Sequence, residues 1–451
     1  MIKAIATRIV GDYNVNTMTT RERRRADNRP ASQLIWPSHL NAKGIARYLD
    51  QNHDLAKGVL DVIEAQMLGA NGLMVDHQPL RDDGSIHAEF AEELEYWHKK
   101  WEESPEVSGE YSWAGLQRIL ARTLYRDGEY LIKDIYTPRF KHRYGIPYSI
   151  EALETDYLAS DYNDPDNMLY QGIKFNEWWQ PVTYYLRDHP ENGHYQMNEP
   201  RQVSAKFIRH AKLTDRLRQP RGISVFASTF RRFNDLMDYE DSERIAAKVA
   251  SNMVMYLRRD PTMLGHSFES DPNRTFEVSP GILWDNLTPG EEPVMMDSNR
   301  PNINLEAYRN SQLKGAAAGS KTSQSSIAKT YDGTYSGQRQ ELIEQYAVYG
   351  VMATHFGWST VLPIKRRVTE AIILSGKVKV PPGIREDSVF DMVCHQPTPP
   401  WIDPGKESAA LVALKDAGLA SPQEIIRKRG RNPREVKREI DEWGKRNEEE
   451  S

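Results

Sequence analysis

Residues 223–260 read ISVFASTFRRFNDLMDYEDSERIAAKVASNMVMYLRRD, and this stretch decides the architecture expected for the chain. It contains neither proline nor glycine, the two residues least compatible with a helix interior. Apolar residues mark one side of it at helical spacing: Ile223, Phe226, Phe230, Phe233, Leu236, Met237, Ile245, Val249, Met253 and Leu257. A helix of about 35 residues spans about 50 Å at 1.5 Å per residue. That is too long for a small globule, so the sequence predicts a rod within a larger assembly.

Upstream of this stretch, the pattern is helical first and then typical of strands. Helices are expected over residues 41–67, 85–103 and 113–126. Strands are expected over residues 129–136, 148–154, 172–175 and 182–186. Residues 10–40 are polar and irregular, and their basic run Arg21–Arg25 is expected to be a solvated arm.

Downstream of the stretch, prolines and glycines divide residues 260–300 into expected short strands and turns. Helices are expected over residues 303–318, 338–356 and 361–375, with a polar tract over 319–337. Strands are expected over residues 376–382 and 389–394. The tail over residues 406–449 is expected to be helical and charged, with breaks at Pro422 and Pro433. The fold class that follows is α+β, mainly α with small β-sheets.

The composition excludes several classes of protein. The chain has 451 residues, a net charge of −5 and a mean hydropathy of −0.69, which disfavours a strongly basic nucleic-acid clamp. Cys394 is the single cysteine, so no intramolecular disulfide can form. Neither a secretory signal nor about 18 uninterrupted apolar residues occur, so the sequence predicts a protein made and assembled in a cytosol, with no membrane contact.

Motifs that would carry catalysis, metal binding or cofactor binding are weak. Residues 315–322, GAAAGSKT, depart from a phosphate-binding loop because Ser320 stands where the second glycine is needed. Residues 161–167, DYNDPDN, carry a proline at the fifth position of a would-be calcium loop and no glycine at the sixth. Cys394 and His395 are adjacent, but a buried structural thiol is the favoured interpretation. The sequence therefore predicts no catalytic residue, no metal, no cofactor and no enzyme.

Five groups of segments carry a family resemblance. The first is IEALETDYL at 150–158 with GIKF at 172–175, PVTYYL at 181–186 and HP at 189–190. The second is IRH at 208–210 with RQPRGIS at 218–224 and DYED at 238–241, and the third is VSPGI at 278–282 with LTPGEE at 287–292. The fourth is AAG at 317–319 with YDG at 331–333 and YSGQR at 335–339, and the fifth is WIDP at 401–404 with KE at 406–407 and GLAS at 418–421. In this order they resemble the portal proteins of tailed bacteriophages, specifically the lambda-like portal family.

The resemblance implies a ring of subunits, with twelve expected, at one vertex of the capsid in the virion. Double-stranded DNA enters through the ring, driven by a separate terminase, and leaves through it at infection. The implied partners are further copies of the chain, the terminase large subunit, a head–tail adaptor, and the major capsid and scaffold proteins. Assembly is expected in the host cytoplasm. A net-acidic conduit is consistent with this role, because about 6–10 basic contacts to phosphates would hold the DNA instead of letting it slide.

Family architecture has wing, stem, clip and crown regions, which the order of segments maps onto this chain. The mapping assigns residues 1–222 to the wing, 223–259 to stem helix 1, 260–300 to the clip, 301–318 to stem helix 2, 319–337 to a tunnel loop, 338–400 to a returning wing helix and strands, and 401–451 to a helical crown. After residues 317–319 the family usually continues with apolar residues, whereas this chain continues with SKTSQSS at 320–326.

Two groups of candidate site residues follow from this mapping. Lys321 and Lys329, with Ser320, Thr322 and Gln324, are expected to line the DNA channel, and the two lysines would approach the DNA backbone weakly and without reading bases. Arg218 and Arg221 flank the start of the stem and are expected to form ion pairs between subunits. Two alternatives remain open: a phage head-associated hydrolase, and a head-completion connector that forms a ring without a long stem helix.

Overall fold

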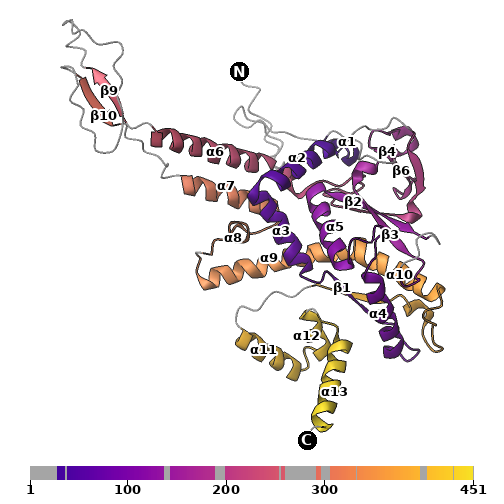
Figure 1. Cartoon of the computed structure of the whole chain (residues 1–451). Coiled ribbons are helices and arrows are strands. Elements are labelled where there is room, and N and C mark those ends of the chain that lie inside the picture. Colours follow the sequence, from indigo (N-terminus) through magenta and orange to yellow (C-terminus); the bar gives the residue numbers. More distant parts are fainter. Residues whose placement is uncertain are drawn as a thin grey trace, which may run out of the picture.

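The computed structural model describes residues 28–35, 38–136, 143–187, 199–252, 255–259, 291–295, 305–331, 333–396, 404–429 and 431–449. Within these residues the chain combines many helices with small two- to four-stranded antiparallel sheets (Figure 1). The predicted mixture of helices with small sheets is therefore confirmed.

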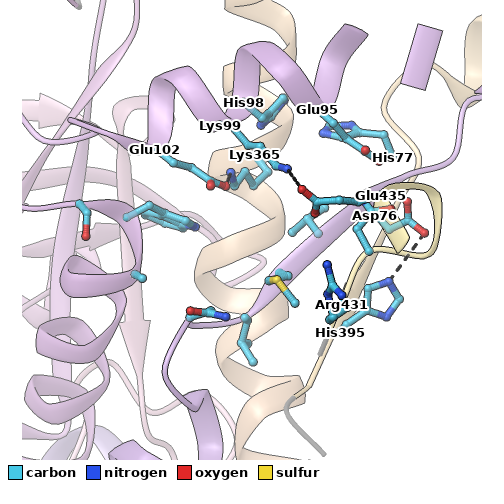
Figure 2. Close-up of a pocket in the computed structure, with 18 residues that line it drawn as sticks. Asp76, His77, Glu95, His98, Lys99, Glu102, Lys365, His395, Arg431 and Glu435 are labelled. Atoms are coloured by element: carbon cyan, nitrogen blue, oxygen red, sulfur yellow. Dashed lines mark hydrogen bonds and ion pairs between the residues drawn. The ribbon is translucent and has the colours of Figure 1, made fainter. Parts of the chain in front are cut away.

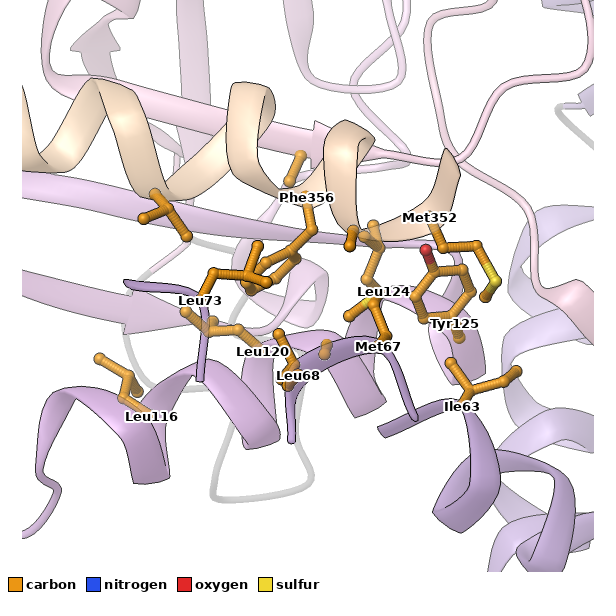
Figure 3. Packing of buried hydrophobic residues seen from close by; sticks show 14 of the residues in the cluster. Ile63, Met67, Leu68, Leu73, Leu116, Leu120, Leu124, Tyr125, Met352 and Phe356 are labelled. Atoms are coloured by element: carbon orange, nitrogen blue, oxygen red, sulfur yellow. The ribbon is translucent and has the colours of Figure 1, made fainter. Parts of the chain in front are cut away.

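The main hydrophobic core lies among helices α2 (His39–Asn52), α3 (Asp54–Leu68), α5 (Trp113–Asp127) and α9 (Tyr335–Phe356). Helix α3 is central, because it packs against each of the other three. Met67 of α3, Leu120 and Leu124 of α5, and Phe356 of α9 meet in this core (Figure 3). Each such buried side chain contributes roughly 1.5–3 kcal/mol. The short helix α1 (Ala31–Ile35) and helix α4 (Ala88–Glu102) complete the N-terminal part.

The single helix predicted over residues 41–67 is two helices, α2 and α3. His53 interrupts them with extended backbone angles of φ −120° and ψ 112°. Its buried ring lies with Nε2 3.2 Å from the carbonyl oxygen of Phe233. Thus the break between the two helices places the His53 ring against Phe233, 180 residues later in the chain. Helical periodicity could not reveal such a long-range contact.

The strands predicted before residue 190 are confirmed with small changes of boundary. Strands β2 (Glu129–Ile135), β3 (Ser149–Leu153) and β8 (Ile208–Lys212) form an antiparallel sheet with β2 in the centre. A second antiparallel sheet has the order β4 (Leu169–Tyr170), β5 (Ile173–Phe175), β6 (Pro181–Leu186) and β7 (Arg201–Ser204). Short 3₁₀ turns lie between these elements: η2 (Thr155–Tyr157), η3 (Pro165–Asn167) and η5 (Ala205–Phe207).

The long helix predicted from residue 223 is shorter than expected. A 3₁₀ turn, η6 (Val225–Ser228), precedes helix α6 (Phe230–Asn252). The last five residues of the predicted helix form strand β9 (Met255–Arg259), which pairs antiparallel with β10 (Glu291–Met295). Met255 and Leu257 also fit helical spacing, so apolar periodicity did not reveal that these residues pair with β10. Most of the predicted clip, residues 260–290 and 296–300, lies outside the described residues.

Beyond this hairpin, helices α7 (Leu305–Gly319), α8 (Gln324–Ala328) and α9 follow one another. The break predicted at Gly357 is instead a π-helical turn, η8 (Gly357–Val361), which leads directly into α10 (Leu362–Leu374). The strand predicted over residues 376–382 is wrong, because these residues are turns and coil before the 3₁₀ turn η9 (Glu386–Ser388). The next predicted strand is β11 (Met392–His395), which pairs with β1 (Met74–His77).

The C-terminal part consists of helices α11 (Pro404–Asp416), α12 (Pro422–Lys428) and α13 (Pro433–Glu449). Helices α12 and α13 begin at the two prolines where breaks were predicted, as expected for the first turn of a helix. Among the described residues, no helix combines the length and the apolar character needed to cross a membrane.

Candidate channel segment and its anchor

Helices α6 and α7 lie side by side and project from the body, with the β9–β10 hairpin at their far end (Figure 1). The Arg309 Nε donates to Glu240 Oε1 at 2.7 Å, which joins the two helices. The rings of Tyr239 and Tyr308 add a contact with their centroids 4.6 Å apart. Gly315 permits the close approach, because a Cβ there would lie 2.6 Å from the Arg232 guanidinium. The pair is therefore a connected two-helix arm.

A buried ion pair anchors the start of this arm to the central strand β2. The Arg221 side chain is fully buried, and its Nε and Nη2 donate to Glu129 Oε1 at 2.8 and 2.5 Å. The second oxygen of Glu129 accepts from the Gly222 backbone N–H at 2.7 Å and from His210 Nε2 at 2.9 Å. Burial works against ionisation, but these partners hold the pKa of Glu129 well below its usual range.

The backbone at this anchor passes extremely close to β2. A Cβ on Gly222 would lie 2.0 Å from the Gly128 carbonyl oxygen, so no side chain fits there. Gly128 itself ends α5 in the left-handed region with φ 92°. The two glycines and the Glu129–Arg221 pair together fix where the segment leading to α6 leaves the sheet.

These contacts give Arg221 a role within its own chain. It is fully buried and donates to Glu129, Ser160 and Gln171, so it is an internal anchor, and its ion pair between subunits stays a prediction. Arg218 is exposed with φ 57°, and its inter-subunit ion pair stays a prediction.

The predicted tunnel loop is folded more tightly than expected. The Ser320 hydroxyl is buried and donates to the Ala316 carbonyl at 2.8 Å, which satisfies the end of α7. Thr322 is buried beside it, with the two hydroxyl oxygens 3.2 Å apart. These two buried side chains therefore hold the loop closed within the chain, and their place in the DNA channel stays a prediction.

Lys321 and Lys329 flank helix α8 and are both exposed. Each has a positive φ, 61° for Lys321 and 55° for Lys329, so the chain turns sharply at both lysines. Gln345 of α9 donates to the Lys321 carbonyl at 2.7 Å, and Gln324 donates to Asn310 at 3.3 Å. Thus two lysines stand at the bends of one braced turn, and their contact with DNA stays a prediction.

A hollow of about 290 Å³ separates this turn from α9. Tyr331, Tyr335, Tyr346 and Tyr349 line it together with Arg339. Burial raises the pKa of Tyr346, and serine, glutamine, Arg339 and Glu341 side chains add polar groups to a lining that is mostly apolar. The sequence analysis missed it, since its residues come from α3, α8 and α9.

A second cavity, of about 310 Å³, lies where the C-terminal helices meet the body (Figure 2). Arg427 of α12 donates to Asp76 Oδ2 at 2.7 Å, and Arg434 of α13 donates to Glu95 Oε1 at 2.5 Å. Lys99 and Glu435 form a further ion pair at 3.0 Å. We call the Arg427, Arg434, Asp76 and Glu95 group the clasp, because it joins α12 and α13 to β1 and α4.

The clasp carries most of this contact. Helix α12 buries no residue fully, and Ile440 and Trp443 of α13 are exposed. Burial opposes ionisation of Asp76, but the two arginines and the nearby half-buried His395, whose Nε2 lies 3.9 Å from Asp76 Oδ2, hold the pKa of Asp76 far below its usual range. Burial raises the pKa of Glu95 to about 7. No motif in the sequence indicates the clasp, because its carboxylates lie more than 300 residues from their arginines.

Catalytic geometry is limited in the described part of the chain. No cluster there of three or more histidines, cysteines or acidic residues could hold a metal ion. Burial raises the pKa of Cys394 to about 12, so this thiol stays protonated and is a poor nucleophile. His98 and His77 lie together in the cavity beside the clasp, and burial keeps both imidazoles neutral at ordinary pH.

A braced two-helix arm that projects from the body, as α6 and α7 do, is typical of a structural component of an assembly. The comparison with known families makes this specific: the phage portal protein family, lambda type, matches residues 18–352. The chain therefore belongs to the lambda family of phage portal proteins, and the resemblance to this family is confirmed; the first four groups of segments lie within the matched residues.

One curated relative is the probable portal protein of Halomonas phage phiHAP-1 (isolate from the Gulf of Mexico, 2001). It is 23% identical over 434 residues, which are 91% of this chain and 81% of the relative. Among solved structures, the neck of a native gene transfer agent particle, computed with C12 symmetry, matches at 12% identity and a TM-score of 0.44 over 84% of this chain and 90% of that chain. The neck of an empty particle, computed with C6 symmetry, matches at 14% identity and a TM-score of 0.45 over 87% and 94%.

Proposed function

We propose that many copies of this chain form a ring at one vertex of a tailed-phage capsid, and that double-stranded DNA passes through the ring. The terminase large subunit packages DNA through it, DNA leaves through it at infection, and a head–tail adaptor docks on it. The ring assembles in the host cytoplasm with the major capsid and scaffold proteins and remains in the virion. The protein is a conduit and not an enzyme. The family match over residues 18–352 carries this proposal.

The geometry of the arm supports the proposal. A helix of 23 residues such as α6 is about 35 Å long. Twelve such helices, packed about 9–10 Å apart around a circle, have an axis circle of about 36 Å in diameter. Subtracting a helix thickness of about 10 Å leaves a bore of about 26 Å, wide enough for a duplex of about 20 Å. The subunits would contact each other head to tail, since only such contacts close into a ring.

We assign the regions of the ring accordingly. Helices α6 and α7 form the stem, and the β9–β10 hairpin begins the clip that docks terminase and adaptor. Residues 319–337 are the tunnel loop, in which Lys321 and Lys329 touch the DNA backbone weakly. The remaining residues before the stem and those over 338–400 form the wing, and residues 401–451 form the crown.

Electron microscopy and native mass spectrometry of the purified protein test this function. The expected result is a ring with an axial hole of duplex calibre, a projecting stem and a mass near twelve subunits. A stable monomer, or a ring without such a hole, would contradict the proposal. Turnover of a nucleic-acid or peptide substrate by the purified protein would support the hydrolase alternative instead.

A further inference from the structure

Helices α12 and α13 are attached to the body mainly through charged side chains. Arg427 of α12 donates to Asp76 Oδ2 at 2.7 Å, and Arg434 of α13 donates to the His77 carbonyl oxygen at 2.6 Å. By contrast, α12 buries no residue fully, and the large apolar side chain of Trp443 in α13 is 68% exposed. Since little apolar burial supports this contact, its strength depends on the ionisation of the clasp.

The two carboxyl groups of the clasp meet at a single nitrogen atom. Arg434 Nη1 lies 2.5 Å from Glu95 Oε1 and 3.3 Å from Asp76 Oδ1. The Asp76 side chain is 4% exposed and the Glu95 side chain 15% exposed, so water screens neither charge well. When two carboxyl groups share a buried site, the repulsion between like charges favours retention of one proton.

One oxygen atom of Asp76 lacks a hydrogen-bond donor. Oδ2 accepts from Arg427 at 2.7 and 3.2 Å, whereas Oδ1 accepts no hydrogen bond from the described residues. The Glu95 side chain is within hydrogen-bonding reach of Asp76. An ionised carboxylate only accepts hydrogen bonds, but a protonated carboxyl has one O–H donor. A proton on Glu95 would therefore satisfy the buried Oδ1 atom, which is costly to leave without a partner.

The surroundings of this carboxyl pair come from several elements beside one cavity (Figure 2). Further charged or titratable side chains there are Arg427 of α12, Arg431 just before α13, Arg434 and Glu435 of α13, His395 of β11, His77 of β1, His98, Lys99 and Glu102 of α4, and Lys365 of α10. The arginines remain charged at any pH at which the protein is folded. The two lysines are paired with glutamates, and burial keeps His77 and His98 neutral at ordinary pH.

We propose that Asp76 and Glu95 share one proton while α12 and α13 are docked on the body, and that loss of this proton to solvent loosens the two helices. With the proton in place, Glu95 donates to Asp76 Oδ1, and the pair carries one negative charge between two arginines. Without it, two buried carboxylates repel each other and Oδ1 again lacks a donor. The clasp is thus a pH-sensitive attachment of the C-terminal helices, a property that goes beyond the conduit function and does not depend on it.

The pH range of the effect follows from the environment of Glu95. Burial, opposed by Arg434 and reinforced by Asp76, raises the pKa of Glu95 to about 7 from its ordinary 4.5. A pKa that is raised in the docked state means that docking is strongest below about 4.5 and weakens as the pH rises through about 7. For one proton, the equilibrium constant of undocking should rise by up to about 10-fold per pH unit between about 5 and 7, and then level off.

Hydrogen exchange of the backbone amides of α12 and α13 in the full chain, corrected for the intrinsic exchange rate at each pH, measures undocking. In the unsubstituted protein, the protection of these amides should fall about 10-fold or more from pH 5 to pH 8. Glu95→Gln places an amide that donates to Asp76 at any pH, so its helices should stay protected without pH dependence. Glu435→Gln is the matched control, because it changes an exposed pair with Lys99 and should keep the pH dependence. His395→Gln should also keep it.

Infrared difference spectra between pH 6 and pH 8 report the shared proton itself. A protonated carboxyl has a C=O band separate from the bands of a carboxylate. This band should be present at pH 6 and lost at pH 8 in the unsubstituted protein, and the change should be absent from Glu95→Gln. Equal protection of α12 and α13 at pH 5 and pH 8 would overturn the inference, as would pH dependence that persists in Glu95→Gln or disappears in His395→Gln. Absence of the infrared change from the unsubstituted protein would overturn it without any variant, and the conduit function would still stand.

Discussion

Replacing Arg221 by methionine would leave the Glu129 carboxylate buried without its main counter-charge. The guanidinium supplies two of the hydrogen bonds that reach Glu129 Oε1, at 2.8 and 2.5 Å. After the substitution, Glu129 would keep only the Gly222 N–H and His210 as close partners. The two-helix arm would then be attached to β2 through an uncompensated charge.

The magnitude follows from the burial of the pair. Arg221 is 0% exposed and Glu129 2% exposed, so solvent cannot replace the lost partner. Removing one partner of a buried ion pair destabilises a protein by about 3–5 kcal/mol. Since whole domains have unfolding free energies of only about 5–15 kcal/mol, we expect this single change to threaten folding of the part of the chain around β2. The double variant Arg221→Met with Glu129→Gln removes both charges and should recover most of the loss.

Thermal unfolding of the purified protein measures this effect. We expect Arg221→Met to lower the melting temperature by roughly 6–20 °C, and the double variant by much less. Arg218→Met is the matched control, because the same substitution three residues away affects an exposed side chain and should change stability by at most about 0.5 kcal/mol. If Arg221→Met and Arg218→Met melt at the same temperature, the anchor does not have the role argued for it.

Three further predictions concern the loop, the clasp and the buried histidines. The double variant Lys321→Ala with Lys329→Ala should leave ring assembly and the melting temperature unchanged. It should reduce the retention of packaged DNA and make that retention less dependent on salt. Unchanged retention would contradict DNA contact by these lysines. Arg427→Ala should increase the hydrogen exchange of backbone amides across α12 and α13, because it removes an ion pair with buried Asp76. The control Lys428→Ala, which changes an exposed ion pair within α12, should leave this exchange unchanged. Equal exchange in the two variants would contradict the role of the clasp. Burial lowers the pKa of His77 to about 3 from 6.5, so the folded chain resists a proton that the unfolded chain accepts. The free energy of unfolding should therefore fall as the pH drops from 6.5 towards 3, by up to about 1.4 kcal/mol per pH unit, and urea titrations of His77→Gln should give a flatter profile than the unsubstituted protein.

Local sequence signals located most elements but not their ends or their long-range contacts. Helix α5 is bounded by Ser112, which caps its N-terminus, and by Gly128, so both ends are visible in the sequence. Helix α6 ends before the predicted point, because the last residues pair with β10, and pairing across the intervening residues leaves no local signal. His53 breaks a continuous apolar pattern for the same reason, since its contact is with Phe233.

In the candidate site, too, local sequence and long-range contacts must be considered separately. Lys321 and Lys329 were predicted to line the DNA channel from the family mapping, and both side chains are exposed in the structure. The burial of Ser320 and Arg221 does not follow, because it depends on the end of α7 and on β2 respectively. Ser320 was predicted to line the channel, and its hydroxyl donates to the Ala316 carbonyl of α7. Arg221 was predicted to pair with another subunit, and its guanidinium donates to the Glu129 carboxylate of its own chain.

The distribution of charge gives these internal roles a functional meaning. The arginines of the anchor and the clasp are committed to carboxylates of the same chain, Glu129, Asp76 and Glu95. Such paired cations release no counterions from DNA, so they add nothing to its binding. Lys321 and Lys329 are exposed at the bends of the loop, and two weak contacts per copy would guide a duplex without stopping it. A conduit needs rigid attachment of its arm and low affinity for its cargo, and pairing the arginines inside the chain meets both requirements at once.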